Sequence, residues 1–182
     1  MEQICHHIMD LAENSTAAGA GLVEISLVED EKEDWLTIEI KDNGRGFNRN
    51  VLDELNGPIA QCSSCSLGLT LLLRSCKEAA GEMEVLAGDD GGARVRGRMR
   101  LSHKARKPLG DLNETLITLI MGSPGVNWVF RHERVRADGT KAALALDTQA
   151  IREEVGGMPL SHPEAIRRIR VSLRQQEAKL SD

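Results

Sequence analysis

A carboxylate and a carboxamide stand about one helical turn apart near the start of the sequence. Asp10 and Asn14 lie in the segment 3–17, whose apolar residues recur at the spacing of an amphipathic helix. Side chains four residues apart share one helix face, and His7, three residues before Asp10, joins it. A carboxylate can activate a water molecule, and a carboxamide oxygen can ligate magnesium. The segment predicts a site for these two functions, with His7 either handling protons or serving as a packing residue.

A second motif, Asp-Asn-Gly-Arg-Gly at 42–46, follows a predicted strand. The Asp42 carboxylate can accept a hydrogen bond from an exocyclic amine. Gly44 and Gly46 allow a flat ring to approach the backbone closely. The structural alternative for Asp42 is an Asx-type turn after the strand. The functional interpretation is a pocket for a flat ring that bears an amine.

The two motifs, with a third at 66–69 (Ser-Leu-Gly-Leu), resemble the GHKL superfamily of gyrase-type topoisomerases, heat-shock chaperones, histidine kinases and MutL-type repair proteins. The resemblance covers about the first hundred residues. Asp10 to Asn14, with the trailing Ala-Gly-Ala, is similar to the family's N box, and 42–46 is similar to its first glycine box. Residues 66–69 open a predicted helix and are similar to the second glycine box, whose amide groups receive phosphates at a helix start. Beyond these, 106–111 and the Glu-Thr-Leu that begins at Glu114 are similar to small stand-alone bacterial ATP-binding proteins of the histidine-kinase-like type.

The resemblance implies a role for each matching residue. Asp42 would hydrogen-bond the adenine amino group, while Gly44 and Gly46 would shape the adenine pocket. Asn14 would ligate a magnesium ion that bridges the phosphates. Asp10 occupies the position of the general base, which is usually a glutamate in the hydrolytic members.

The resemblance also implies a phosphate site at Ser66, Leu67, Gly68 and Leu69, beside a mobile lid over about 57–66. Several positions depart from the family pattern: Asp10 is shorter than glutamate, Ser66 replaces a glycine, and Gly92-Ala93 replaces a Gly-Thr pair. The lid segment contains no lysine to pair with a terminal phosphate. These departures predict intact adenine recognition and weakened phosphate handling.

Hydrophobic periodicity predicts the elements that must position these residues. Strands are expected near 22–28, 36–41, 82–87, 93–101, 126–133 and 140–147, and helices near 3–17, 48–56, 66–80 and 111–121, with two more ending the chain, the last from Pro163. The acidic run 29–34 is interpreted as a solvated hairpin connection. This order predicts an α/β two-layer sandwich, a mixed sheet with helices on one face, which the resemblance makes a Bergerat-type ATP-binding fold. The basic segment 102–108 suggests a boundary between an ATP-binding domain at 1–107 and an α/β extension at 108–182, for which packing on the same sheet is one arrangement.

Composition limits the classes of function. The 182 residues contain only two Trp and two Phe, so stacking platforms for single-stranded nucleic acid are not expected, and the net charge of -5 opposes polyanion binding. No apolar run approaches the length of a membrane helix, and the first residues lack the features of a signal peptide. Four cysteines in such a chain favour free thiols in a reducing cytoplasm.

Two further features have open interpretations. Cys62 and Cys65 in the expected lid are either ordinary thiols or a thiol or metal control of the lid. Arginines at 94, 96, 98 and 100 alternate with other residues, so all four lie on one sheet face. That face is either solvated and paired with carboxylates or a docking surface for an acidic partner or for the carboxy-terminal extension.

The function that these features predict is magnesium-dependent ATP binding with slow hydrolysis, or with phosphoryl transfer to a separate protein partner. One alternative is a regulatory switch in which ATP changes partner affinity with little turnover. A sensor that uses the thiols of Cys62 and Cys65 is a second alternative. The sequence leaves open whether the chain forms a homodimer.

Overall fold

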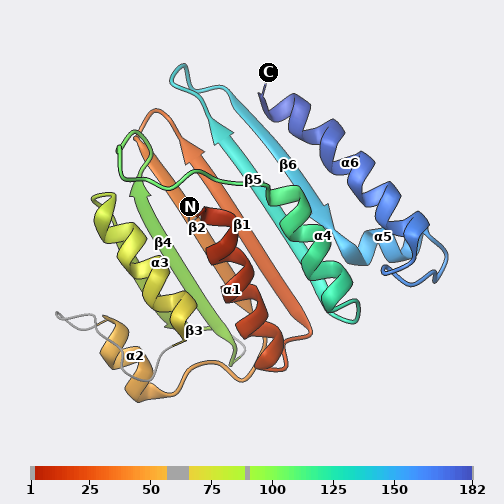
Figure 1. The fold of residues 1–182 in the computed structure, drawn as a ribbon, viewed down its shortest axis with the longest axis horizontal. Helices are drawn as coiled ribbons and strands as arrows, with labels where there is room; N and C mark the ends of the chain where they lie inside the picture. The colour runs from red at the N-terminus through yellow and green to blue at the C-terminus, as the bar shows by residue number, and fades with distance from the viewer. Residues whose placement is uncertain (1–2, 57–65, 89–90, 182) are drawn as a thin grey trace.

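The computed structural model describes residues 3–56, 66–88 and 91–181, which form one six-stranded sheet in the order β3-β4-β2-β1-β5-β6 (Figure 1). The strands are β1 (Leu22–Asp30), β2 (Trp35–Asp42), β3 (Glu82–Ala87), β4 (Ala93–Arg100), β5 (Asn127–Val135) and β6 (Lys141–Asp147). The helices are α1 (Ile4–Ala17), α2 (Arg49–Asn56), α3 (Leu67–Glu78), α4 (Leu112–Gly122), α5 (Thr148–Glu154) and α6 (Pro163–Ser181). Strands β1 and β5 are parallel and the other neighbours antiparallel, so the sheet is mixed.

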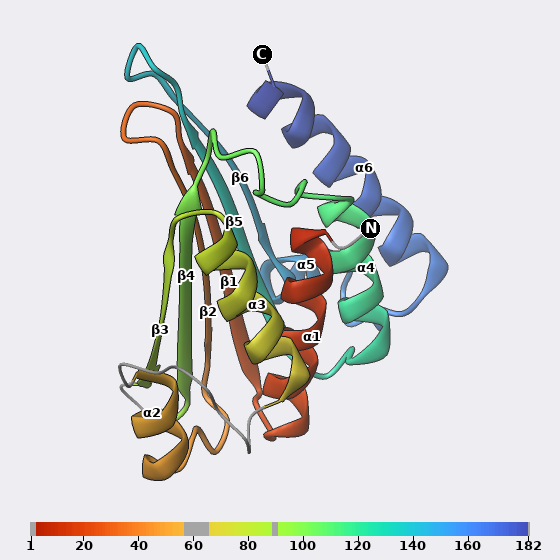
Figure 2. The ribbon, with the colours of Figure 1, turned by 60° about the vertical axis from the view of Figure 1, so that its left-hand side comes forward.

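Helices α1, α3, α4 and α6 cover one face of the sheet and leave the other face open (Figure 2). The strand sequences dictate this arrangement, because alternate residues of β1, β2 and β4 are buried. The buried positions carry mostly apolar side chains, with Asp42 at the end of β2 as an exception, and the open positions mostly charged ones. The predicted two-layer α/β fold is therefore confirmed.

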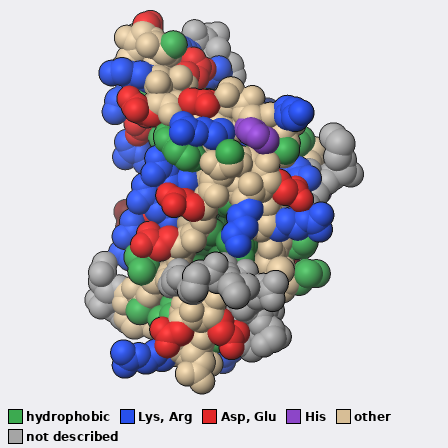
Figure 3. All heavy atoms as spheres, turned by 90° about the vertical axis from the view of Figure 1, so that its left-hand side faces the viewer, with side chains coloured by type: hydrophobic (Ala, Val, Ile, Leu, Met, Phe, Trp, Pro, Cys, Tyr) green, Lys and Arg blue, Asp and Glu red, His purple; other side chains and the backbone are tan. Residues whose placement is uncertain are grey.

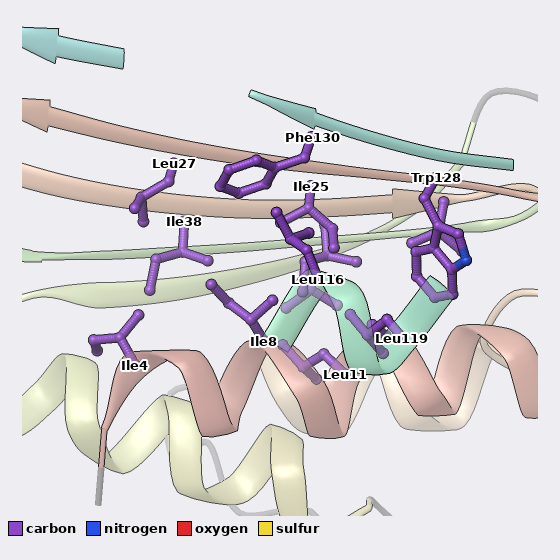
Figure 4. Close-up of a cluster of buried hydrophobic side chains, with 14 of the residues drawn as sticks. Ile4, Ile8, Leu11, Ile25, Leu27, Ile38, Leu116, Leu119, Trp128 and Phe130 are labelled. Carbon is purple, nitrogen blue, oxygen red and sulfur yellow. The ribbon is translucent and has the colours of Figure 1, made fainter. Parts of the chain in front are cut away.

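The main core lies between the sheet and helices α1 and α4 (Figure 4). Ile4, Ile8 and Leu11 of α1 are spaced to face the sheet, and each is less than 5% exposed. They pack in one cluster with β1, β2, β5 and α4 side chains, which include Ile25, Leu27, Ile38, Leu116, Leu119, Trp128 and Phe130. This packing fixes α1, the helix that carries Asp10 and Asn14, against the sheet.

The residues after 107 extend the same sheet. Strand β5 pairs in parallel with β1 from Leu22↔Asn127 to Asp30↔Val135, and β6 pairs antiparallel with β5. Side chains from both segments share one hydrophobic cluster. The boundary at 107 stays a prediction about chain organisation, since the described residues on its two sides build one sheet.

The acidic run 29–34 is shorter as a connection than the sequence indicates. Strand β1 continues through Asp30, which pairs with Trp35 at the start of β2. The reason is that Glu29 and Glu31 have basic partners on β5: His132 Nε2 lies 2.8 Å from Glu29 Oε1, and Arg134 donates to Glu31. Two of the acidic residues therefore join β1 to β5 instead of facing only solvent.

The contact between Glu29 and His132 makes the stability of this joint depend on pH. Burial alone would raise the pKa of Glu29, but the hydrogen bond with His132 and the nearby positive charges hold it below its ordinary value. A carboxyl with a lowered folded-state pKa contributes stability above its unfolded pKa and loses it as the pH falls through the folded value.

We expect Glu29→Gln to lower the free energy of unfolding at pH 7 by about 1 kcal/mol, because it removes the charge of a hydrogen-bonded pair. The difference from the parent should shrink as the pH falls below about 4.5, the ordinary value for this carboxyl. Urea unfolding at several pH values measures this, with Glu33→Gln as a control on an exposed carboxyl in the same run. A constant difference across the pH range would contradict the prediction.

Among the described residues, no helix combines the length and the apolar character that crossing a membrane requires.

Candidate functional site

A cavity of about 250 Å³ opens between α1, the loop after β2, and the start of α3. Its wall combines apolar side chains with a small number of polar ones, the usual make-up of a ligand site. The apolar side chains are Leu11, Ala17, Ala18, Ile40, Phe47, Val51, Leu69, Ala93 and Val95, and the polar residues are Asn14, Ser15, Asp42, Arg45 and Ser66, with Gly46 between them. The cavity thus unites all three sequence motifs.

The carboxylate of Asp42 is the most constrained polar group of the cavity. Asp42 is the last residue of β2, at a position that faces the helices, and it is 8% exposed. Atom Oδ1 accepts from the backbone N–H of Gly44 at 2.9 Å and of Ala93 at 3.3 Å, and Oδ2 accepts from Ser15 Oγ at 2.7 Å. A carboxylate has about four acceptor positions, so one remains for a donor on a ligand.

The glycines of the loop after β2 allow two turns to interlock at the cavity. Gly46 has φ +66°, and a Cβ there would come within 2.6 Å of the Gly91 carbonyl oxygen. A Cβ on Gly92 would overlap the carbonyl oxygen of Asp42. A side chain at either position would force the two turns apart and widen the cavity floor.

The start of α3 lies against the face of α1 that carries Asp10 and Asn14. Asn14 Nδ2 donates to Ser66 Oγ at 2.9 Å. A Cβ on Gly68 would lie 2.7 Å from Asp10 Cβ, so the absence of a side chain at Gly68 lets the two helices approach this closely. These contacts bring Asp10 and Gly68 together, and likewise Asn14 and Ser66, of which Asn14 and Ser66 line the cavity.

The start of α3 has no capping hydrogen bond from the side chain at its cap position. Ser66 stands at the cap position of α3, but its side chain makes no capping hydrogen bond and contacts Asn14 instead. Leu67 is 72% exposed and does not line the cavity, whereas Leu69 is buried and forms part of the cavity wall. Ser66 thus leaves the first amide groups of α3 uncapped, which suits them to an anionic ligand.

Residues 1–103 match the family model described as "Histidine kinase-, DNA gyrase B-, and HSP90-like ATPase". The chain belongs to this ATPase family. Membership implies that the domain binds ATP.

A solved structure shows the same fold. The MutL ATPase domain of Aquifex aeolicus complexed with ADP is similar with a TM-score of 0.51 and 16% identity, over 86% of this chain and 68% of that one. The ATP-binding domain of PrrB from Mycobacterium tuberculosis gives 0.35 and 28% identity, over 50% of this chain and 60% of that one. A search of curated proteins found no match.

The structure of this ATPase domain separates His7 from the cavity. The imidazole is 1% exposed, and its Nε2 lies 3.0 Å from Oγ of Ser75 on α3. It therefore lies within the interface of α1 and α3, the environment of a packing histidine. Asp10 lies on the same face of α1. Its side chain is only partly buried and packs against Gly68 at the start of α3.

The cysteines of the ATPase domain fall into two groups. Cys62 and Cys65 lie outside the described residues, so a thiol or metal role for them stays a prediction. Cys5 and Cys76 are free and buried, and burial raises the pKa of Cys76 to about 12. At neutral pH Cys76 is therefore a protonated, unreactive thiol. The described residues contain no cluster of three or more His, Cys, Asp or Glu side chains that could hold a metal.

Two polar residues of the cavity were not assigned a role from the sequence. Ser15 is 5% exposed and donates to Asp42. Its place in the apolar stripe, four residues after Leu11, is a sequence signal that could have identified it as a buried polar residue. Arg45 lies inside the quoted loop motif and is the one cation among the described cavity residues. Asn43 does not line the cavity but holds its loop in place: its Oδ1 accepts from the N–H of Gly21 and Leu22, which connects the loop to β1.

Proposed function

We propose that the cavity binds magnesium ATP, with adenine at Asp42 and the phosphates at the start of α3. The observation that carries this proposal is the buried Asp42 carboxylate, which three donors fix and which keeps acceptor capacity toward the cavity. Adenine offers an exocyclic amine to that acceptor and a flat apolar ring to the surrounding side chains. Guanine would place its exocyclic carbonyl oxygen against the carboxylate, so ATP is favoured over GTP.

The phosphate end of the proposal rests on α3 and on Asn14. The N-terminus of a helix attracts anions through its free amide groups and its dipole. Magnesium keeps several waters and binds through few protein ligands together with phosphate oxygens, so a single carboxamide is a sufficient protein contribution. Asn14 fits this role, since it lies beside the helix start. When bound, magnesium would neutralise phosphate charge.

Asp10 is the proposed general base, and we infer slow turnover. Its side chain lies against Gly68 and is one methylene shorter than glutamate, which limits its reach toward an attacking water. Arg45 is the one cation among the described residues of the cavity, so charge on the phosphates is weakly compensated. These observations also favour a second candidate, a switch in which ATP binding alters the affinity for a protein partner with little turnover.

Calorimetric titration of the purified chain with ATP, in the presence and absence of magnesium, tests the proposal. We expect ATP binding that magnesium strengthens, poor binding of GTP, and slow phosphate release in a coupled assay. Absence of ATP binding would overturn the assignment of the cavity. Binding without any phosphate release would favour the switch over the ATPase or protein kinase.

We expect Gly68→Ala to weaken ATP binding about tenfold while adenosine binding changes little. The added Cβ would lie 2.7 Å from Asp10 Cβ, so the start of α3 must move away from α1, and its amides with it. Adenosine has no phosphate and depends only on the Asp42 end. Titrations with both ligands measure the difference.

Gly122→Ala is the matched control, because a Cβ there meets no atom within 4 Å. It should bind ATP as the parent does. Equal losses for ATP and adenosine in Gly68→Ala would contradict the placement of the phosphates.

We further propose that residues 1–107 act as the ATP-binding domain and 108–182 as its extension, and that a separate cytoplasmic protein is the partner. The similarity to the MutL domain, a structure that contains ADP, supports nucleotide binding in this fold. A homodimer stays open, and size-exclusion chromatography with and without ATP tests it.

A further inference from the structure

The open face of the sheet carries a row of four arginines that the nucleotide site does not use. Arg94, Arg96, Arg98 and Arg100 alternate along β4 with residues that face the helices, and each is partly exposed. We call these four residues the arginine row. Viewed from the side of β3, Figure 3 shows Lys and Arg side chains gathered in a column, with acidic side chains among them.

Among the described residues, half of the row has a carboxylate partner, and the two arginines concerned share it. Arg94 donates to Glu39 Oε2 at 2.8 Å, and Arg96 Nε lies 3.9 Å from the same oxygen. Arg98 and Arg100 instead lie over the ring of Trp35, 4.3 Å and 4.0 Å from its centroid. Within the described part of the chain, no carboxylate lies within 4 Å of either of these two guanidinium groups. Their charge is therefore available to a ligand.

The extension does not cover the row. Helix α6 packs on β6 and α4, on the side of the sheet that the other helices occupy (Figure 2). This excludes, for the described residues, the hypothesis that the row binds the carboxy-terminal extension. Of the two docking hypotheses for the row, binding of a separate molecule therefore remains, and the alternative is a solvated row.

The spacing of the row identifies the shape of that molecule. Alternate residues of a strand are about 6.8 Å apart, so four guanidinium groups form a line about 20 Å long. An extended polypeptide with acidic residues at alternate positions has the same spacing. Arginine and tryptophan are the residues that most often anchor protein interfaces, and Trp35 with its two arginines forms such an anchor at one end.

We propose that the arginine row binds an extended acidic segment of a protein partner, with carboxylates on Arg98 and Arg100. Nucleic acid fits less well, because glutamates border the row on both sides. Glu82 and Glu84 of β3 stand opposite Arg98 and Arg96, and Glu39 of β2 stands opposite Arg96. A nucleic-acid strand carries one phosphate charge per about 3.4 Å, twice the density of carboxylates at alternate peptide positions, so these glutamates oppose it more strongly.

The test uses a fluorescein-labelled peptide of alternating Glu and Ala, about twelve residues long, and fluorescence anisotropy without nucleotide. The double variant Arg98→Gln/Arg100→Gln should bind about five- to tenfold more weakly than the parent. The control Arg167→Gln/Arg168→Gln removes the same charge from exposed positions on α6 and should bind as the parent does. The chain has two tryptophans, so a Trp128→Phe background leaves Trp35 as the sole reporter, and its emission should change on binding.

Three outcomes would overturn the proposal: no peptide binding by the parent at millimolar concentration, equal losses in the two double variants, or unchanged Trp35 emission on saturation. Tighter binding of an oligothymidylate of the same length would assign the row to nucleic acid instead. The variant Asp42→Asn should bind the peptide normally, because Asp42 faces the opposite side of β2. Failure of the ATP proposal and failure of this one are therefore distinguishable.

Discussion

Asp42→Asn should weaken ATP binding about ten- to a hundredfold and leave the fold intact. One charge-assisted hydrogen bond contributes about 1.5–3 kcal/mol, which corresponds to this range of affinity. The asparagine oxygen can keep accepting from the N–H of Gly44 and Ala93, and Ser15 Oγ can reverse its role and accept from the amide. The amide NH₂ would then face the adenine amine, so two donors oppose each other.

Isothermal titration of ATP into parent and variant measures the loss, and thermal unfolding checks the fold. Ser15→Ala is the matched control, since it removes one donor to the carboxylate but keeps the carboxylate itself. We expect it to weaken ATP binding by less than about fivefold. Equal ATP affinity in Asp42→Asn and the parent would remove adenine from this end of the cavity.

The elements of the fold could be predicted because their signals are local. Polar and apolar residues alternate along β1, β2 and β4, and apolar residues recur at helical spacing in α1. Each of these patterns lies within one short segment, and the structure contains all six expected strands. The parallel pairing of β1 with β5 has no local signal, because it joins residues about a hundred positions apart. The length of β1 was underestimated for the same reason: Glu29 belongs to the strand through its contact with His132 of β5.

The candidate site also has features with a local sequence signal and features that depend on contacts between distant residues. The glycines at 44 and 46 identify the loop at 42–46 in the sequence, and a Cβ at Gly46 would meet a neighbouring turn. The sequence alone does not show that Gly68 lies against Asp10, because the two positions belong to different helices. His7 illustrates the limit most clearly, since its side chain shares a helix face with Asp10 but is buried against Ser75, a residue that only the fold brings near.

Asp10→Asn should retain ATP and magnesium binding and lose phosphate release. The amide has the size and hydrogen-bonding reach of the carboxylate but cannot take a proton from water at neutral pH. Its Cβ keeps the same contact with Gly68, so the start of α3 should not move. Phosphate release measured at saturating magnesium ATP, together with calorimetric titration, separates the loss of chemistry from any loss of binding.

Asn14→Ala is the companion variant on the same helix face, and its expected effect is the opposite one. It removes the carboxamide that contacts Ser66, so the part of the ATP affinity that depends on magnesium should disappear while binding without metal changes little.

Equal turnover in Asp10→Asn and a clearly active parent would remove Asp10 from the mechanism. His7 would then be the next residue to test, with its imidazole 1% exposed and its Nε2 3.0 Å from Ser75 Oγ. A parent that binds ATP and releases no phosphate would instead agree with the short reach of Asp10 and the single cation among the described residues of the cavity, and the nucleotide would then act as the signal of a switch.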